Sequence, residues 1–159
     1  MDNKGLLDAV QTAIEAERAA RQFYLSAAEK TANPQGKALL LELADFEAYH
    51  EQKLADLVRS LGAGQYIAYQ GKELARPKPE GGKASQKEAN LREVVDVLNL
   101  AMDAEQKAQE RYSRLAKPTD DPLGKAMFER LAQEEATHYR ILSDEFYTLS
   151  NKGLWVWAE

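Results

Sequence analysis

The sequence repeats itself at a constant spacing of 88 residues, and this repeat is the strongest constraint on its fold. Residues 13–56 and 101–144 align without a gap, with 18 identities in 44 positions. The matched positions include two Glu-x-x-His pairs, Glu47/His50 and Glu135/His138, which hold the only histidines in the chain. Shared helical composition does not explain such a match. The repeat therefore predicts a duplicated structural unit with a pseudo-two-fold axis.

Each repeat has the pattern of a helical hairpin. Apolar residues recur at alternating steps of three and four, the period of one face of an α-helix. An N-cap residue followed by proline interrupts each stripe, at Asn33-Pro34 and at Asp121-Pro122. We therefore predict a single domain over residues 1–159. Its parts are hairpin 1 over about 3–62, a crossover over about 63–90, hairpin 2 over about 91–150 and a tail over 151–159.

The crossover is rich in glycine and proline and is too long for a tight turn between antiparallel neighbours. Its length suits a connection that runs along a bundle. We expect a short helical piece near residues 68–74 and a capping box, Ser85-x-x-Glu88, that opens the third helix. The predicted fold class is thus an all-α four-helix bundle with a long crossover between helices 2 and 3.

The tail Leu154-Trp155-Val156-Trp157 is apolar and aromatic. We expect it to cap the open end of the bundle, and a dimer contact is the main alternative.

The hairpin geometry brings two further glutamates to the Glu-x-x-His pairs. Positions three apart share a helix face, so the Glu and the His of one pair can converge on one ion. Residues equidistant from a hairpin turn face each other, and Glu17 and Glu105 stand level with the two pairs. The candidate metal ligands are Glu17, Glu47, His50, Glu105, Glu135 and His138.

Charge balance favours metal ions at such a cluster. Ionised carboxylates without partners are very costly in a core, whereas two divalent cations neutralise four of them. One imidazole per metal in an oxygen-rich set suits iron or manganese and admits zinc. The alternatives are solvated Glu–His pairs, or a buried salt bridge from Glu17 to Arg18 or Arg21. We predict two metal ions per chain, with iron favoured.

Tyr24 and Tyr112 each follow a candidate ligand by seven residues, two turns along the same stripe. We predict that each hydroxyl donates to a ligand carboxylate and orients it. A tyrosine that packs in the core with its hydroxyl satisfied elsewhere is the alternative.

Composition narrows the classes of function. The net charge of −5 and the lack of a basic run argue against nucleic acid as a partner. The absence of cysteine excludes disulfides, thiolate catalysis and a rubredoxin-type iron site. The N-terminal residues lack the apolar core of a signal peptide, and no run approaches 18 apolar residues. We expect a cytoplasmic protein that does not bind membranes.

The motifs resemble the rubrerythrin family of the ferritin-like di-iron carboxylate superfamily. Two segments resemble the first two helices of the family: Glu17-x-x-Ala20-x-x-x-Tyr24 and Phe46-Glu47-Ala48-Tyr49-His50. Two others resemble the last two helices: the one that contains Glu105 and the one that contains Glu135-x-x-His138. The chain departs from the family in two respects. It has no cysteine for a rubredoxin domain, and Ala108 stands where rubrerythrins carry an extra Glu.

The resemblance implies a ferritin-like bundle and a non-haem di-iron oxidoreductase that reacts with hydrogen peroxide or dioxygen. It implies that Glu47 and Glu135 bridge the two ions, that Glu17 and Glu105 are terminal ligands, and that no catalytic residue is separate from the ligands. Electrons would come from a separate donor protein, and the chain would form a homodimer. The alternative is non-enzymatic binding of iron or another metal, for storage or sensing.

Overall fold

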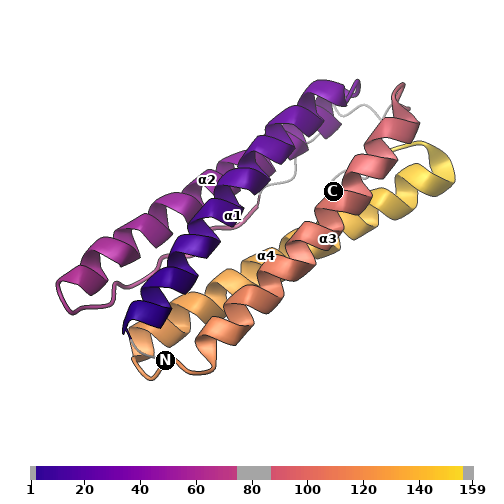
Figure 1. The fold of residues 1–159 in the computed structure, drawn as a ribbon. Helices are drawn as coiled ribbons and strands as arrows, with labels where there is room; N and C mark the ends of the chain where they lie inside the picture. The colour runs from indigo at the N-terminus through magenta and orange to yellow at the C-terminus, as the bar shows by residue number, and fades with distance from the viewer. Residues whose placement is uncertain (1–2, 75–86, 156–159) are drawn as a thin grey trace.

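The computed structural model describes residues 3–74 and 87–155, and these form four helices without a β-strand. The helices are α1 (Asn3–Lys30), α2 (Pro34–Gly62), α3 (Leu91–Ala116) and α4 (Pro122–Lys152). Helices α1 and α2 form one hairpin, α3 and α4 form the other, and α1 packs against α3 where the hairpins meet (Figure 1). The predicted all-α four-helix bundle is confirmed. No helix among the described residues is long and apolar enough to span a membrane.

The two hairpin turns use the same capping device, as the repeat predicts. The side chain of Asn33 accepts hydrogen bonds from the backbone N–H groups of Gln35 and Gly36, at 2.9 and 3.0 Å. Asp121 caps α4 in the same way, and a proline occupies the start of both α2 and α4. Because the caps satisfy otherwise unpaired N–H groups, each turn ends one helix and starts the next within a few residues.

The described part of the crossover contains no helix, so the predicted helical piece over residues 68–74 is wrong. Its backbone groups bond to side chains of the bundle instead: Gln70 C=O accepts from the Tyr49 hydroxyl, and Lys72 N–H donates to Glu134. The predicted capping box does not open α3, because α3 begins at Leu91 with Asn90 at the N-cap position and Glu88 precedes it. Ser85 itself lies outside the described residues.

Glu88 binds the hairpin-1 turn to the start of α3. Its carboxylate accepts hydrogen bonds from the backbone N–H groups of Ala32, Asn33 and Asn90, at 2.9–3.0 Å, and from the Trp155 indole at 3.2 Å. Burial by itself raises the pKa of the Glu88 carboxyl, but these donors outweigh it and the pKa is lowered. The carboxylate is therefore held ionised where three segments meet: the hairpin-1 turn, the start of α3 and the residues after α4.

An aromatic side chain covers each hairpin turn, and each comes from the end of the other hairpin. Trp155, which is 2% exposed, packs so closely on Gly36 that a Cβ there would overlap the indole. Tyr66, beyond the end of α2, lies against Gly124 in the same manner. The cap predicted for the tail is thus confirmed for Trp155, whereas residues 156–159 lie outside the described part of the chain.

The core consists of two apolar clusters, one toward each end of the bundle. One cluster contains Leu40, Leu43, Leu98 and Leu142, and the other contains Val10, Leu54, Leu115, Phe128 and Leu131. Within each helix, the buried Glu and His side chains other than Glu145 fall between the segments that supply the two clusters. The bundle therefore holds a buried polar layer at its middle, closed by hydrophobic packing on either side.

Candidate metal centre

All six predicted ligands lie in the middle layer of the bundle, and none is more than 2% exposed. One comes from each of α1 and α3, and a Glu-x-x-His pair comes from each of α2 and α4. They form two groups, in each of which four ligand atoms lie within 4.8 Å of one another. The groups are Glu17, Glu47, His50 and Glu135, and Glu47, Glu105, Glu135 and His138.

Each imidazole turns the same nitrogen, Nδ1, toward the carboxylates. His50 Nδ1 lies 2.8 Å from Glu135 Oε1 and 3.5 Å from Glu17 Oε1. His138 Nδ1 lies 3.6 Å from Glu47 Oε1 and 3.6 Å from Glu105 Oε1. Glu47 and Glu135 belong to both groups, so they stand between the two histidines.

The donor atoms of these groups fit cations. Among the described residues, six buried atoms that face the centre have no hydrogen-bond partner of good geometry: Glu17 Oε2, Glu47 Oε1, His50 Nδ1, Glu105 Oε2, Glu135 Oε1 and His138 Nδ1. Two of them, His50 Nδ1 and Glu135 Oε1, form the ion pair at 2.8 Å described above. Unpartnered polar atoms in a core cost free energy unless something pairs with them. Every candidate ligand thus directs one such atom to the centre, and two cations shared by the ligands would pair with all six atoms.

Crowding of the carboxylates alters their protonation. Burial raises the pKa of Glu47 well above its ordinary value, and the negative charges of Glu17 and Glu105 raise it further. The pKa of Glu135 is raised well above its ordinary value for the same reasons. Burial opposes the protonated form of His50, but the charge of Glu17 and the hydrogen bond with Glu134 outweigh it, so its pKa is raised. Without metal, these groups retain protons that a cation would displace.

The two predicted tyrosines both donate to candidate ligands, and each bond crosses from one hairpin to the other. Tyr24 on α1 donates to Glu105 Oε1 on α3 at 2.5 Å, and Tyr112 on α3 donates to Glu17 Oε1 on α1. Burial first, and then the neighbouring carboxylates, raise the pKa of both phenols well above the ordinary value. The hydroxyls therefore stay protonated and fix one oxygen of each carboxylate. Both hydroxyls thus contact candidate ligand carboxylates as the sequence predicted, and their role in orienting metal ligands stays a prediction.

The structure adds one residue that the sequence prediction missed. Glu134, which is 4% exposed, bonds to His50 Nε2 at 3.0 Å, on the side of the ring away from the candidate metal position. A carboxylate behind a ligating imidazole fixes the ring and makes its other nitrogen a better ligand. Glu134 directly precedes Glu135, so on the helix it points to a different side from its neighbour.

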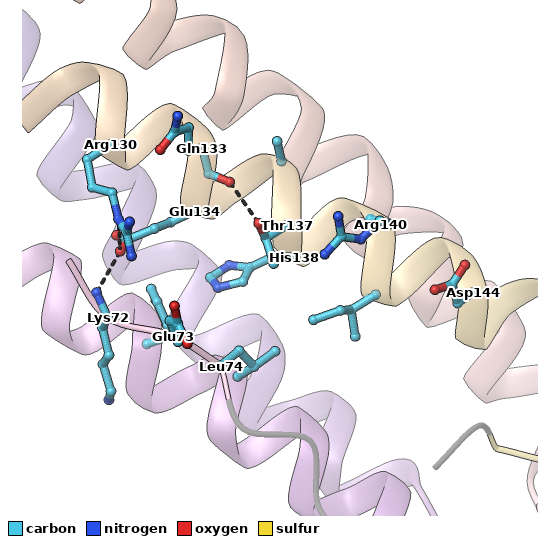
Figure 2. A pocket seen from close by; sticks show the side chains of 13 residues that line it. Lys72, Glu73, Leu74, Arg130, Gln133, Glu134, Thr137, His138, Arg140 and Asp144 are labelled. Carbon is cyan, nitrogen blue, oxygen red and sulfur yellow. Dashed lines mark hydrogen bonds and ion pairs between the residues drawn. The ribbon is translucent and has the colours of Figure 1, made fainter. Parts of the chain in front are cut away.

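Glu134 is itself held by three further groups. The Tyr69 hydroxyl donates to Oε1 at 2.5 Å, and Lys72 N–H and Arg130 Nε donate to Oε2 at 2.7 and 3.2 Å. Figure 2 shows Glu134 between Arg130 of α4 and Lys72 of the crossover segment. Burial raises the pKa of Glu134, but the bonds with His50, Tyr69 and Lys72 outweigh it and the pKa is lowered. His50 therefore faces an ionised carboxylate.

His138 has no such support. The residue 88 positions before Glu134 is Phe46, whose ring lies edge-on to His138 with centroids 4.3 Å apart. His138 Nε2 has no hydrogen-bond partner among the described residues. The His138 ring lines a cavity of about 740 Å³ beside α4, with charged side chains such as Lys72, Arg130 and Arg140 on its walls (Figure 2).

Comparison with known proteins agrees with this geometry. The family model described as Rubrerythrin matches residues 8–146, which is most of the chain. The chain belongs to the rubrerythrin family. Members of this family bind metal ions, typically iron, and the two buried groups of carboxylates and histidine here could hold such ions. No rubredoxin domain is evident in the chain, as the lack of cysteine predicts.

Solved structures confirm the ferritin-like fold. A hypothetical protein from Pyrococcus furiosus is similar at 30% identity and a TM-score of 0.74, over 94% of this chain and 93% of that one. A two-domain protein from Anabaena variabilis, with DJ-1/ThiJ/PfpI-like and ferritin-like domains, has 18% identity and a TM-score of 0.67. That similarity covers 96% of this chain and 42% of the other, and it supports the fold alone. No curated protein matches the chain.

Proposed function

We propose that this rubrerythrin-family chain holds two iron ions in the centre and is an oxidoreductase that reduces hydrogen peroxide or dioxygen. The observation that carries the proposal is the pair of overlapping ligand groups, in which Glu47 and Glu135 are shared. A shared pair of carboxylates keeps two cations close together, and the four carboxylates balance their charge. Two adjacent metal ions supply Lewis acidity and one electron each to a bound oxidant.

The side chains around the centre would act by holding the ligands in place. Glu47 and Glu135 would bridge, and Glu17 and Glu105 would be terminal ligands. Tyr24 and Tyr112 each fix one oxygen of a terminal carboxylate and leave Oε2 of that carboxylate unpartnered. Glu134 fixes the His50 ring with Nδ1 directed inward. Because these bonds hold the candidate ligands with unpartnered atoms directed toward one another, little rearrangement of the ligands would be needed to form the centre.

The electron donor, the oligomeric state and the cellular location of the protein are taken from the sequence predictions. The chain has no cysteine for a rubredoxin-type iron site, so we propose that electrons come from a separate donor protein. The homodimer and the cytoplasmic location stay predictions.

Metal titration followed by oxidation tests the proposal. Protein purified without added metal is first analysed for metal content, then titrated anaerobically with Fe(II), and finally exposed to hydrogen peroxide or to dioxygen. We expect about two irons per chain, as the two ligand groups require, and rapid appearance of ferric absorbance that electrons from an added reductant reverse.

The outcomes separate the proposal from its main alternative. Two Fe(II) ions that bind and stay unchanged with both oxidants would contradict the oxidoreductase and leave metal binding for storage or sensing. A stoichiometry near zero would contradict both functions. The Glu129→Gln variant, altered at an exposed carboxylate of α4, is the matched control and should behave as the wild type.

A further inference from the structure

A second cavity reaches the carboxylates of the centre, and neither histidine lines it. It lies between α1 and α3 and has a volume of about 330 Å³. Both helices contribute small side chains to its walls: Ala16 and Ala20 from α1, and Ala104 and Ala108 from α3. These residues are related by the repeat, since each pair of positions is 88 residues apart. The pseudo-two-fold axis thus places four alanines around one space.

The mouth and the inner end of the cavity differ in chemistry. Phe23 and Leu100 line it together with the alanines, and Leu100 is 60% exposed, so an apolar route leads in from the surface. Two cations also line it, Lys107 and the half-buried Arg111, and the Lys107 ammonium is exposed and paired with Asp103 at 2.9 Å. A cation already paired in solvent contributes little to binding of an anion here. The comparison of toluene with benzoate below tests whether Arg111 favours an anion.

The inner end consists of the candidate ligands. Glu17, Glu47, Glu105 and Glu135 all line the cavity. The Oε2 atoms of Glu17 and Glu105 have no hydrogen-bond partner among the described residues, and both side chains are 98% buried since each is 2% exposed. A molecule in the cavity would therefore lie directly against the carboxylate side of the centre.

We propose that the α1–α3 cavity binds a small apolar organic molecule next to the metal centre. An apolar cavity of about 150 Å³ is known to hold benzene, and the volume of about 330 Å³ here is roughly twice as large. It therefore accommodates one aromatic ring with a short substituent, or an alkyl chain of similar size. The charged walls of the cavity beside His138 exclude that side as the apolar route.

This inference deepens the proposed function, on which it rests for what would happen to the bound molecule. A substrate of this class would lie within reach of an oxidant bound at the carboxylate side. Binding itself requires no redox step, so it can be measured independently of turnover.

Toluene is a suitable probe, and saturation-transfer NMR measures its binding to the protein as purified and to the redox-silent Zn(II)-loaded protein. We expect saturable binding to both. Ala20→Leu and Ala104→Leu each add three carbons to a cavity wall, and each should weaken toluene binding at least ten-fold. Ala104 is exposed, so its substitution tests the inference even where Ala20→Leu impairs folding. Ala126→Leu, at an exposed position of α4 outside the cavity, should bind toluene as the wild type does.

Three results would overturn the inference. These are absence of saturable toluene binding, equal binding by the two cavity variants and the wild type, and tighter binding of benzoate than of toluene. Failure of Fe(II) to react with peroxide or dioxygen would contradict the proposed function and leave the toluene result unaffected. Loss of toluene binding would leave the metal stoichiometry unaffected, so the two failures are distinguishable.

Discussion

His50 and His138 occupy equivalent positions in the two repeats, and each directs Nδ1 toward the shared carboxylates. Behind the ring, their surroundings differ. His50 bonds to Glu134, which Tyr69, Lys72 and Arg130 hold in place. His138 has the Phe46 ring beside it, and its Nε2 has no partner in the described part of the chain.

This difference shows that the duplication preserved the candidate ligands and the tyrosines that hold Glu17 and Glu105, but not the support behind the histidines. The structural cause is the crossover, which exists only once. It follows α2 and supplies Tyr69 and Lys72 to the His50 side. The half-site with a fixed, ionised carboxylate behind its imidazole should bind a divalent cation more tightly. The two ions should therefore load in order, the His50 side first.

The largest expected effect comes from removing a shared ligand. Glu135→Gln should abolish binding of both ions, because Glu135 belongs to both groups. Glu17→Gln should leave about one ion per chain, because the group around His138 stays complete. Metal analysis after anaerobic Fe(II) loading distinguishes these outcomes. Equal loss in the two variants would contradict the sharing of Glu135.

Removal of all metal should destabilise the fold, and more so at high pH. The folded-state pKa values of Glu47, Glu135 and His50 are raised, so the metal-free protein has their full stabilisation only below the unfolded pKa values. It loses that stabilisation through the raised pKa values as pH rises, from about 4.5 for the two carboxyls and from about 6.5 for His50. Bound metal reverses the loss, by about 2.7 kcal/mol when free metal is a hundred times Kd.

Thermal unfolding with and without chelator, from pH 5 to pH 8, measures this effect. The gap in Tm should widen as pH rises. Equal Tm values of the metal-free and metal-loaded protein at pH 7 would contradict a buried metal centre.

Glu134→Gln should weaken binding at one half-site alone. The amide keeps the size of the side chain and removes its charge, so metal affinity on the His50 side should fall roughly 10- to 100-fold. A titration that resolves two binding steps should show the tighter step weakened and the other nearly unchanged. Glu129→Gln is again the control, and equal weakening of both steps would contradict the asymmetry.

The smallest effect concerns the ends of the bundle, which also differ. Trp155 and Glu88 cover one hairpin turn, whereas Tyr66 lies over the other. Glu88→Gln should reduce stability at pH 7 by about 1.5–3 kcal/mol, the range for hydrogen bonds to a charged group. The folded pKa of Glu88 is lowered from 4.5, so its contribution is present above that value and is lost as pH falls through the folded pKa.

Urea unfolding of the wild type and Glu88→Gln at several pH values checks this prediction. The two proteins should approach equal stability at low pH. A constant difference in stability across pH 3–7 would contradict the role of the charge.

The sequence alone predicted the features that depend on local rules and on the repeat. Helical periodicity and the Asn33-Pro34 and Asp121-Pro122 caps define the hairpins, and distance from the turns places Glu17 and Glu105 level with the Glu-x-x-His pairs. These relations hold within one helix or one hairpin, so no knowledge of tertiary packing is needed.

The missed features all involve the crossover or its contacts. The helical piece expected over residues 68–74 does not form, because the backbone there bonds to Tyr49 and Glu134. Glu134 could have been suspected from one signal, since Phe46 and Glu134 differ at a repeat position next to a ligand. The groups that hold Glu134 could not be predicted from the sequence, because Tyr69 and Lys72 lie in an irregular segment without periodicity.

Anomalous diffraction at the iron edge, from crystals loaded anaerobically with Fe(II), tests the shared centre most directly. We expect two peaks a few ångströms apart, one among Glu17, Glu47, His50 and Glu135, and one among Glu47, Glu105, Glu135 and His138. At limiting iron, the peak on the His50 side should be the stronger. A single peak, or peaks outside these groups, would contradict a dinuclear centre that shares Glu47 and Glu135.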